Sequence, residues 1–117
     1  NIAMADGSGL SRRNLVTPNL MTEWLRLIAG ASDFERFSAL LPAAGQEGTL
    51  KYRLNGRTAG KVLAKTGRLA TVISMAGYVR TSSGRLVAFC IIVNNVPPGN
   101  DSPKTAIDEI VKILHRY

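Results

Sequence analysis

Residues 61–67, KVLAKTG, begin the part of the chain that decides the fold. A short apolar run leads into a lysine, a threonine and a glycine, and two longer strand-like runs follow at residues 70–81 and 85–94. The residues between those two runs, Ser82-Ser83-Gly84, are typical of a short hairpin loop. The three runs predict three antiparallel strands, with Gly77 as a bulge or a site of close backbone approach in the second.

The third predicted strand contains residues 86–93, LVAFCIIV, which are all apolar. An unbroken apolar run of this length is typical of a strand that is buried on both faces in the middle of a sheet. In a sheet of three strands joined by hairpins, however, it would lie at an edge. We therefore expect neighbouring strands outside this sequence. We also expect the chain alone to form a homo-oligomer through that edge or a nearby apolar face.

Helical patterns occupy the residues before the strands. Thr17 is a suitable cap for a helix that begins at Pro18 and ends near Gly30. The apolar face of this helix includes Trp24, which we expect in the core. A second, short helix is predicted over residues 34–41, where a proline follows and stops it.

One more helix is predicted after the strands. Ser102 and Pro103 suit the cap and the first residue of this C-terminal helix. The apolar stripe of that helix consists of Ile107, Ile110, Val111 and Leu114. Before the strands, residues 49–54 suit one or two further helical turns. The order of elements predicts an α+β fold, a three-stranded antiparallel sheet with packed helices, and the 117 residues suit one small domain.

The composition excludes several classes of function. The formal charge is +7, but Lys and Arg do not interleave with the few aromatic residues, so we expect no nucleic-acid partner. The single cysteine, Cys90, excludes an internal disulfide, and we expect it to be a small buried hydrophobe. With a single histidine, His115, the sequence has too few suitable side chains for a zinc site or a Ser-His-Asp triad. We expect no metal or cofactor. No apolar run approaches the roughly 20 residues of a transmembrane helix.

The Lys65-Thr66-Gly67 tripeptide carries chemistry that suits the binding of a carboxylate. An ammonium beside a hydroxyl can hold a carboxylate through charge-assisted hydrogen bonds. The glycine allows a substrate backbone to approach closely, and an exposed strand edge can pair with an extended peptide. The N–H of Arg68, which follows the glycine, can point at a developing oxyanion. The tripeptide by itself also suits an ordinary strand that ends in a turn.

Residues 6–14, DGSGLSRRN, form a second candidate region. Two glycines with Asp and Ser beside them predict a tight loop rather than a helix. The loop is either a connector or a rigid element that offers Ser8, Arg12 and backbone groups to a ligand. The residues alone leave both interpretations open.

Several stretches together resemble one known family. Residues 6–12, the Lys65-Thr66-Gly67 tripeptide, residues 76–79 (AGYV), the Gly84 turn and residues 89–94 resemble the C-terminal part of D-alanyl-D-alanine carboxypeptidases of the penicillin-binding protein 4 (DacB-like) type. The resemblance covers nearly the whole chain. It implies a C-terminal fragment of a penicillin-binding, β-lactamase-like domain, whose five-stranded antiparallel sheet has helices on both faces. It also implies a periplasmic location.

The resemblance implies acyl transfer on peptidoglycan stem peptides. A serine attacks the carbonyl of the penultimate D-alanine, D-alanine leaves, and water releases the acyl group; cross-links are cut by the same chemistry. β-Lactams acylate the same serine. Lys65 and Thr66 would bind the terminal carboxylate and assist proton transfer, Gly67 would give clearance, and the N–H of Arg68 would be an oxyanion donor.

The resemblance also implies a pocket for the side chain of the stem peptide, lined by Ser8, Leu10, Arg12 and Leu69. An arginine there suits a side chain that carries an acid. One departure from the family lies at Arg68, where Ser or Thr is usual. The change keeps the backbone donor, removes a hydroxyl and adds a positive charge.

A second departure is the absence of the Ser-x-x-Lys and Ser-x-Asn motifs from this sequence. No serine here is predicted to be the nucleophile, because such a serine needs an adjacent base. We therefore expect this chain to be inactive alone and its parent to be active. The alternatives are a non-catalytic module that binds peptidoglycan or a partner, and an unrelated basic domain that binds nucleic acid.

Overall fold

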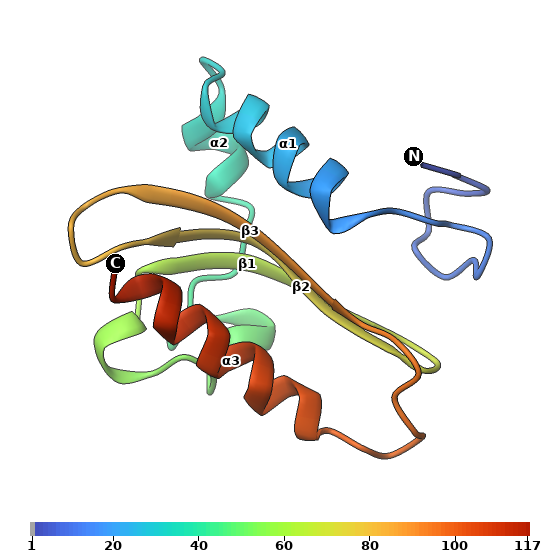
Figure 1. Ribbon diagram of the computed structural model, residues 1–117. Coiled ribbons are helices and arrows are strands. Elements are labelled where there is room, and N and C mark those ends of the chain that lie inside the picture. The colour runs from blue at the N-terminus through green and yellow to red at the C-terminus, as the bar shows by residue number, and fades with distance from the viewer. Residues whose placement is uncertain (1) are drawn as a thin grey trace.

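The computed structural model describes residues 2–117, and Figure 1 shows the expected order of helix, short helix, three strands and helix. The three strands form one antiparallel sheet in the order β1-β2-β3, which confirms the predicted α+β fold class. The elements are α1 (Pro18–Ala29), α2 (Phe34–Ser38), β1 (Val62–Leu69), β2 (Val72–Arg80), β3 (Leu86–Val93) and α3 (Ser102–His115), with 3-10 turns η1 (Gly48–Leu50) and η2 (Gly56–Thr58).

The sheet lies between two helical layers. Figure 1 shows α1 and α2 on one face, and α3 with the turns η1 and η2 on the other. The main core fills the space between the sheet and α3, where Val62, Met75 and Val111 have no exposed surface. On the opposite face the buried Tyr78 hydroxyl donates to the carbonyl of Leu25 at 2.7 Å, which fastens α1 to the central strand.

The central strand β2 contains the glycine that the sequence singled out. The register of β1 and β2 is continuous, with Ala64 opposite Gly77, so the prediction of a close backbone approach is confirmed and no bulge interrupts the pairing. A Cβ added to Gly77 would lie 2.2 Å from the carbonyl oxygen of Leu63. Because that oxygen belongs to the backbone, any larger residue at this position must push β1 away from β2.

The predicted N-terminal cap is confirmed at α1 but not at α3. The Thr17 hydroxyl accepts from the amide of Leu20 at 3.2 Å, as expected of a cap. At α3 the predicted cap, Ser102, is instead the first helical residue. Its amide donates to the side-chain oxygen of Asn100 at 2.9 Å, so a preceding asparagine replaces the predicted serine as the acceptor.

Trp24 is a correction to the predicted core. Its side chain is 48% exposed, because α1 lies mainly over the edge strand β3 and part of its apolar face reaches past the sheet. The ring instead meets Phe37 of α2 edge-on, at 6.0 Å between ring centroids. The helix α2 is also shorter than predicted, since it ends at Ser38 and Leu40 is exposed.

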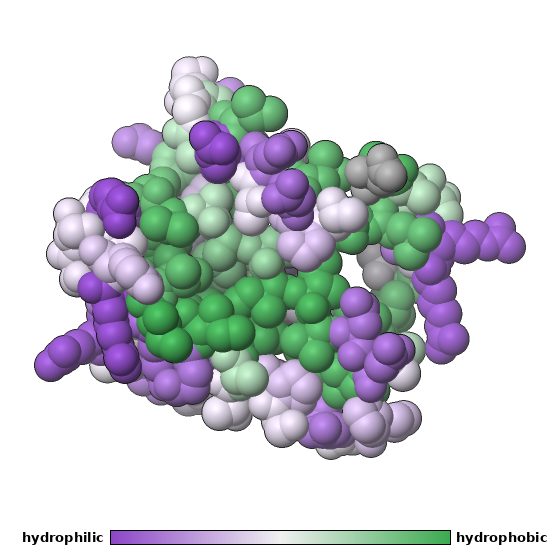
Figure 2. All heavy atoms as spheres, viewed as in Figure 1, coloured by the Kyte–Doolittle hydropathy of each residue, from purple (hydrophilic) through white to green (hydrophobic). Residues whose placement is uncertain are grey.

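The third strand is half-buried rather than buried on both faces. Phe89 is its one fully buried residue, and Cys90, predicted to be buried, is half-buried. Among the described residues β3 pairs with β2 alone, so its other edge is open. Figure 2 shows hydrophobic side chains gathered over this edge and the neighbouring side of α3. Additional strands beside β3 therefore stay a prediction.

An ion pair joins the segment before the strands to the last helix. The Arg53 guanidinium donates to both carboxylate oxygens of Asp108, at 3.1 and 2.8 Å, and to the carbonyl of Lys104 at 3.2 Å. Both side chains are mostly buried, so this forked contact holds the segment between η1 and η2 against α3. None of the helices described for residues 2–117 is both long and apolar enough to cross a membrane.

Candidate active-site wall

The two faces of β1 carry different residues. Val62 and Ala64 point into the core beneath the sheet, and neither has any exposed surface. Because side chains alternate along a strand, Lys65, Gly67 and Leu69 lie on the opposite face, toward α1. The face that holds the lysine is thus open above and supported by a packed core below.

The backbone of β1 also alternates. The amide of Arg80 donates to the carbonyl of Lys61 across the two strands at 2.8 Å. Backbone groups in an antiparallel pair point alternately toward the partner strand and away from it. The backbone groups of Lys65 and Gly67 therefore form hydrogen bonds with β2. The backbone groups of Thr66 and Arg68 point outward, away from β2.

The outer edge of β1 is covered at one end and open at the other. The amide of Ala64 donates outward to the carbonyl of Pro42 at 3.1 Å, so the segment before η1 covers that position. Beyond it, the amides of Thr66 and Arg68 also point outward, and no backbone bond to either occurs at this edge among residues 2–117. Two unused donors on an edge strand suit an extended peptide or an oxyanion.

The side chains of the tripeptide are held near that edge. The Lys65 ammonium donates to the carbonyl of Thr66 at 2.6 Å, and the side chain is exposed. The Thr66 hydroxyl donates to the hydroxyl of Thr49 on η1 at 2.9 Å. The ammonium has three protons, so donors remain for a ligand.

The side chain of Arg68 does not enter this face. Its guanidinium pairs with the carboxylate of Asp101, just before α3, on the far side of the sheet. Asp101 also accepts from Lys104 at 2.9 Å; hydrogen bonds from Lys104 and then from Arg68 lower the pKa of its carboxyl. The extra positive charge noted in the sequence is therefore neutralised away from the tripeptide, and the backbone N–H is what Arg68 presents at the edge.

A small cavity opens directly above the tripeptide. It has a volume of about 250 Å³, and a Cβ added to Gly67 would meet the Ser74 hydroxyl at 2.6 Å. The glycine therefore keeps this part of the sheet clear. The lining residues are Val16, Met21, Lys65, Thr66, Gly67, Ser74, Ala76, Cys90 and Ile92.

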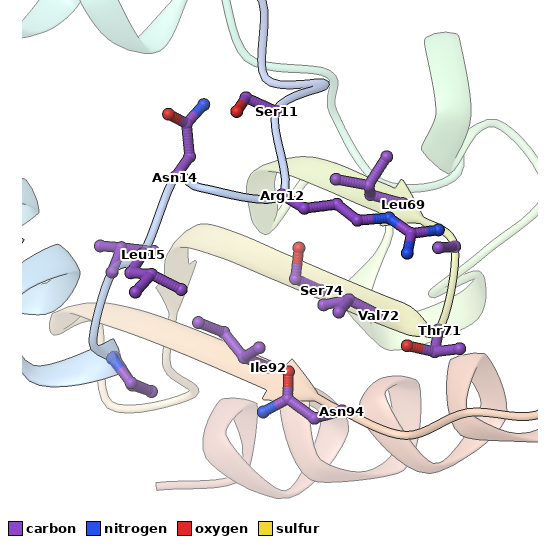
Figure 3. Close-up of a pocket in the computed structure, with 13 residues that line it drawn as sticks. Ser11, Arg12, Asn14, Leu15, Leu69, Thr71, Val72, Ser74, Ile92 and Asn94 are labelled. Carbon is purple, nitrogen blue, oxygen red and sulfur yellow. The ribbon is translucent and has the colours of Figure 1, made fainter. Parts of the chain in front are cut away.

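A larger cavity of about 560 Å³ continues along the same face. Figure 3 shows Arg12 reaching over Leu69, while Ser74, Ile92 and Asn94 face the cavity from the sheet. Because Ser74 and Ile92 line both cavities, the tripeptide and Arg12 open onto one groove. The structure thus brings Arg12 and Leu69 together with Lys65 and Gly67; Thr66 also lines the groove, but its side chain points to the opposite face of β1, toward Thr49.

Ser8 and Leu10 lie elsewhere on the N-terminal loop and line neither cavity. The Asp6 carboxylate accepts from the Ser8 hydroxyl at 3.1 Å and from the Asn14 side chain at 3.1 Å. The hydrogen bond from Asn14, ahead of those from Ser8, lowers the pKa of Asp6. The Ser8 hydroxyl therefore braces the loop here, and its contact with a substrate stays a prediction.

Sequence reasoning missed several residues of the groove. Ser74 lies opposite Gly67 in the register of β1 and β2, so the hairpin pattern could have located it. Cys90 lies opposite Ala76 on the same face, where burial raises the pKa of its thiol. Thr49 is on a separate turn, and no local signal connects it to Thr66. Within the described part of the chain, no three His, Cys, Asp or Glu residues cluster as metal ligands would.

Comparisons of sequence give a consistent result. The chain matches the D-Ala-D-Ala carboxypeptidase 3 (S13) family over residues 1–117. It is 38% identical over 108 residues to the D-alanyl-D-alanine carboxypeptidase DacB of Haemophilus influenzae, and 40% identical over 122 residues to a D-alanyl-D-alanine carboxypeptidase of Actinomadura sp.. These matches cover 90% and 99% of this chain but 22% of each relative, so the chain spans about a fifth of their length.

Solved structures agree with the sequence matches. Penicillin binding protein 4 (dacB) from Haemophilus influenzae matches with a TM-score of 0.88 and 33% identity, over 100% of this chain and 28% of that one. The same protein complexed with a novel β-lactam also gives 0.88, over 100% of this chain and 29% of that one. With the family match along its full length and these relatives in sequence and fold, the chain belongs to the D-Ala-D-Ala carboxypeptidase 3 (S13) family.

Proposed function

We propose that this chain forms one wall of the active site in a serine-type D-alanyl-D-alanine carboxypeptidase and endopeptidase. The substrates are peptidoglycan stem peptides. The observation that carries the proposal is the open outer edge of β1, where the amides of Thr66 and Arg68 point outward beside the exposed Lys65. A groove runs from that edge to Arg12 and is large enough for a peptide side chain.

The proposed roles follow from the direction of each group. An extended D-Ala-D-Ala terminus lies along the outer edge of β1, with its carboxylate at Lys65 and Thr66. The N–H of Arg68 donates to the carbonyl oxygen of the bond under attack as negative charge develops on it. Gly67 leaves room for the substrate because a side chain there would fill the cavity.

The Arg12 guanidinium selects the side chain of the stem peptide. It lines the larger cavity together with the apolar Leu69 and Ile92. A long aliphatic side chain that ends in a carboxylate fits this combination, because its methylene groups lie against apolar residues while its acid pairs with the guanidinium. Ser8 and Leu10 would join this pocket through a change of the N-terminal loop when substrate binds.

The attacking serine and its base come from polypeptide outside this sequence, which contains no Ser-x-x-Lys. In this proposal that polypeptide also adds two strands beside β3 and completes a five-stranded sheet. The serine attacks the carbonyl of the penultimate D-alanine, and the terminal D-alanine leaves. Water then hydrolyses the acyl-enzyme and releases the shortened peptide. β-Lactams react with the same serine, and the protein acts in the periplasm.

Labelling with a fluorescent penicillin tests the proposal. The full-length protein should be labelled, whereas the chain of residues 1–117 alone should not be. Lys65→Met in the full-length protein should reduce labelling strongly, while Lys51→Met, at an exposed lysine on another segment, should not. Peptidoglycan binding by an unlabelled full-length protein would favour the non-catalytic module instead.

A further inference from the structure

We propose that Thr49 is a positioning residue for Thr66. When a carboxylate binds, the Thr49 hydroxyl donates a hydrogen bond to Thr66 Oγ1, and this leaves the hydroxyl proton of Thr66 free to point at the carboxylate. The inference rests on the proposed function, because it concerns how the same site binds the terminal carboxylate of its substrate.

The contact joins two separate parts of the fold. Thr66 Oγ1 and Thr49 Oγ1 are 2.9 Å apart, although 17 residues separate them in sequence. Among the residues the structure describes, neither hydroxyl has a second hydrogen-bond partner. Each hydroxyl keeps its own proton, so what can change in this contact is which hydroxyl donates the hydrogen bond and which accepts it.

The backbone on either side of Thr49, whose own side chain is exposed, is held in place. Leu50, the next residue, is fully buried in the core, and its carbonyl accepts from the amide of Gly45 at 2.9 Å. On the other side, Gly48 has φ 57°, which makes the turn that presents Thr49 to β1. A threonine on so constrained a backbone has few side-chain conformations, so its hydroxyl is in place before a ligand arrives.

Counting protons explains why this contact matters. A hydroxyl has one proton to donate and two lone pairs that accept, whereas an ionised carboxylate can only accept. In the structure Thr66 donates to Thr49, so its proton is engaged. To donate to a carboxylate, Thr66 must release that bond, and a small rotation of the Thr49 side chain must then bring its proton toward Thr66. The hydrogen bond is kept with its direction reversed.

The reversed arrangement strengthens binding of the carboxylate in two ways. Thr66 keeps a partner on its lone pair, so no hydrogen bond is lost as the ligand binds. A hydroxyl that accepts a hydrogen bond is polarised and becomes a better donor. Lys65 provides the charge at this site, and the pair of threonines provides a donor with a defined direction.

Steady-state kinetics of the full-length protein on a peptide ending in D-Ala-D-Ala tests this inference. Thr49→Val replaces the hydroxyl by a methyl group and keeps the shape of the side chain. We expect kcat/KM to fall about three- to tenfold, the range of one neutral hydrogen bond, mainly through a higher KM. Thr49→Ser should restore the wild-type value. Thr49→Ala should give a smaller loss than Thr49→Val, because a water molecule can take the place of the hydroxyl.

A double-mutant cycle separates positioning from a general structural effect. In a Thr66→Val background, Thr49→Val should change kcat/KM little further, because the hydroxyl it acts through is gone. Thr105→Val, at an exposed threonine on α3, is the matched control and should behave as wild type. An equal loss from Thr49→Val in both backgrounds, or no loss in either, would overturn the inference. Absence of turnover by the wild-type protein would instead overturn the proposed function on which it rests.

Discussion

The outer edges of β1 and β3 belong to the same three-stranded sheet but differ in chemistry. The edge of β1 combines a lysine, a threonine and a glycine with outward amides, and it opens onto a groove. The edge of β3 is apolar along its length, and hydrophobic side chains surround it in Figure 2. A polar open edge suits reversible binding of a peptide, whereas an apolar open edge suits permanent burial against more polypeptide.

The two edges show which features separate a binding site from an interface. Both edges have unused backbone donors and acceptors, so pairing capacity alone does not distinguish a binding site from an interface. The side chains on either side of the edge do distinguish them.

The largest effect is expected at the β1 edge from Arg68→Pro in the full-length protein. Proline removes the outward amide without removing a bond to β2, and edge strands tolerate it there. Loss of one oxyanion donor should slow penicillin acylation about 10²–10³-fold, as for other such donors. Stopped-flow acylation rates measure it. Arg68→Ser keeps the amide and is the control; similar rates for both variants would mean that the amide is not used.

The next largest effect concerns the strand that separates the two edges. In Gly77→Ala the new methyl group would lie 2.2 Å from the carbonyl oxygen of Leu63, so β1 must move away from β2. We expect a loss of about 3 kcal/mol in the free energy of unfolding, near the upper end for overpacking. Denaturant titration measures it. Gly7→Ala, which would meet nothing within 4 Å, should be nearly neutral.

A smaller effect is expected at the β3 edge of the isolated chain. We predict concentration-dependent self-association in sedimentation experiments, through this edge or the apolar face beside it. Leu86→Lys places a charge on the edge and should weaken association about fivefold, or about 1 kcal/mol. Leu40→Lys, at an 80% exposed leucine outside the sheet, serves as the control. A strict monomer at high concentration would contradict the prediction.

The smallest effect is expected at Asp101, which lies just before α3 and pairs with Arg68 of β1. Its hydrogen bonds to Lys104 and Arg68 lower its pKa in the folded state. A lowered carboxyl pKa stabilises the fold at pH values above the unfolded-state pKa, and this stabilisation is lost as the pH falls through the folded-state pKa. Asp101→Asn should therefore lower the denaturant midpoint slightly at neutral pH, and the two midpoints should converge in acid. A constant difference across the pH range would exclude this ion pair as the cause.

The sequence alone predicted much of the fold because its signals are local. Apolar strand-like runs, a short serine-glycine turn and capped helical stretches located the helices and strands to within a few residues. Gly77 was recognisable because a glycine inside a strand often marks a bulge or a close approach of another backbone. Trp24 was wrongly placed in the core, because periodicity gives the direction of an apolar face but not the width of the sheet beneath it.

The candidate site was predictable to the extent that its residues adjoin one another. Lys65, Thr66 and Gly67 were identified as a unit, the glycine-rich loop indicated Arg12, and the resemblance added Leu69 and joined them all in one site across a long gap. Ser8 was included as part of the same glycine-rich loop as Arg12, yet in the structure its hydroxyl donates to the Asp6 carboxylate. Proximity along a loop does not determine which side chain faces the groove.

The set of elements and the chemical groups on β1 could be read from the residues alone, because both depend on neighbours along the chain. The contact of Arg68 with Asp101 and that of Thr66 with Thr49 became known only from the folded arrangement. These contacts depend on which face of the strand a residue occupies and on how distant segments pack against that face. Strand pairing sets the first and core burial sets the second, and neither acts until the whole domain has folded.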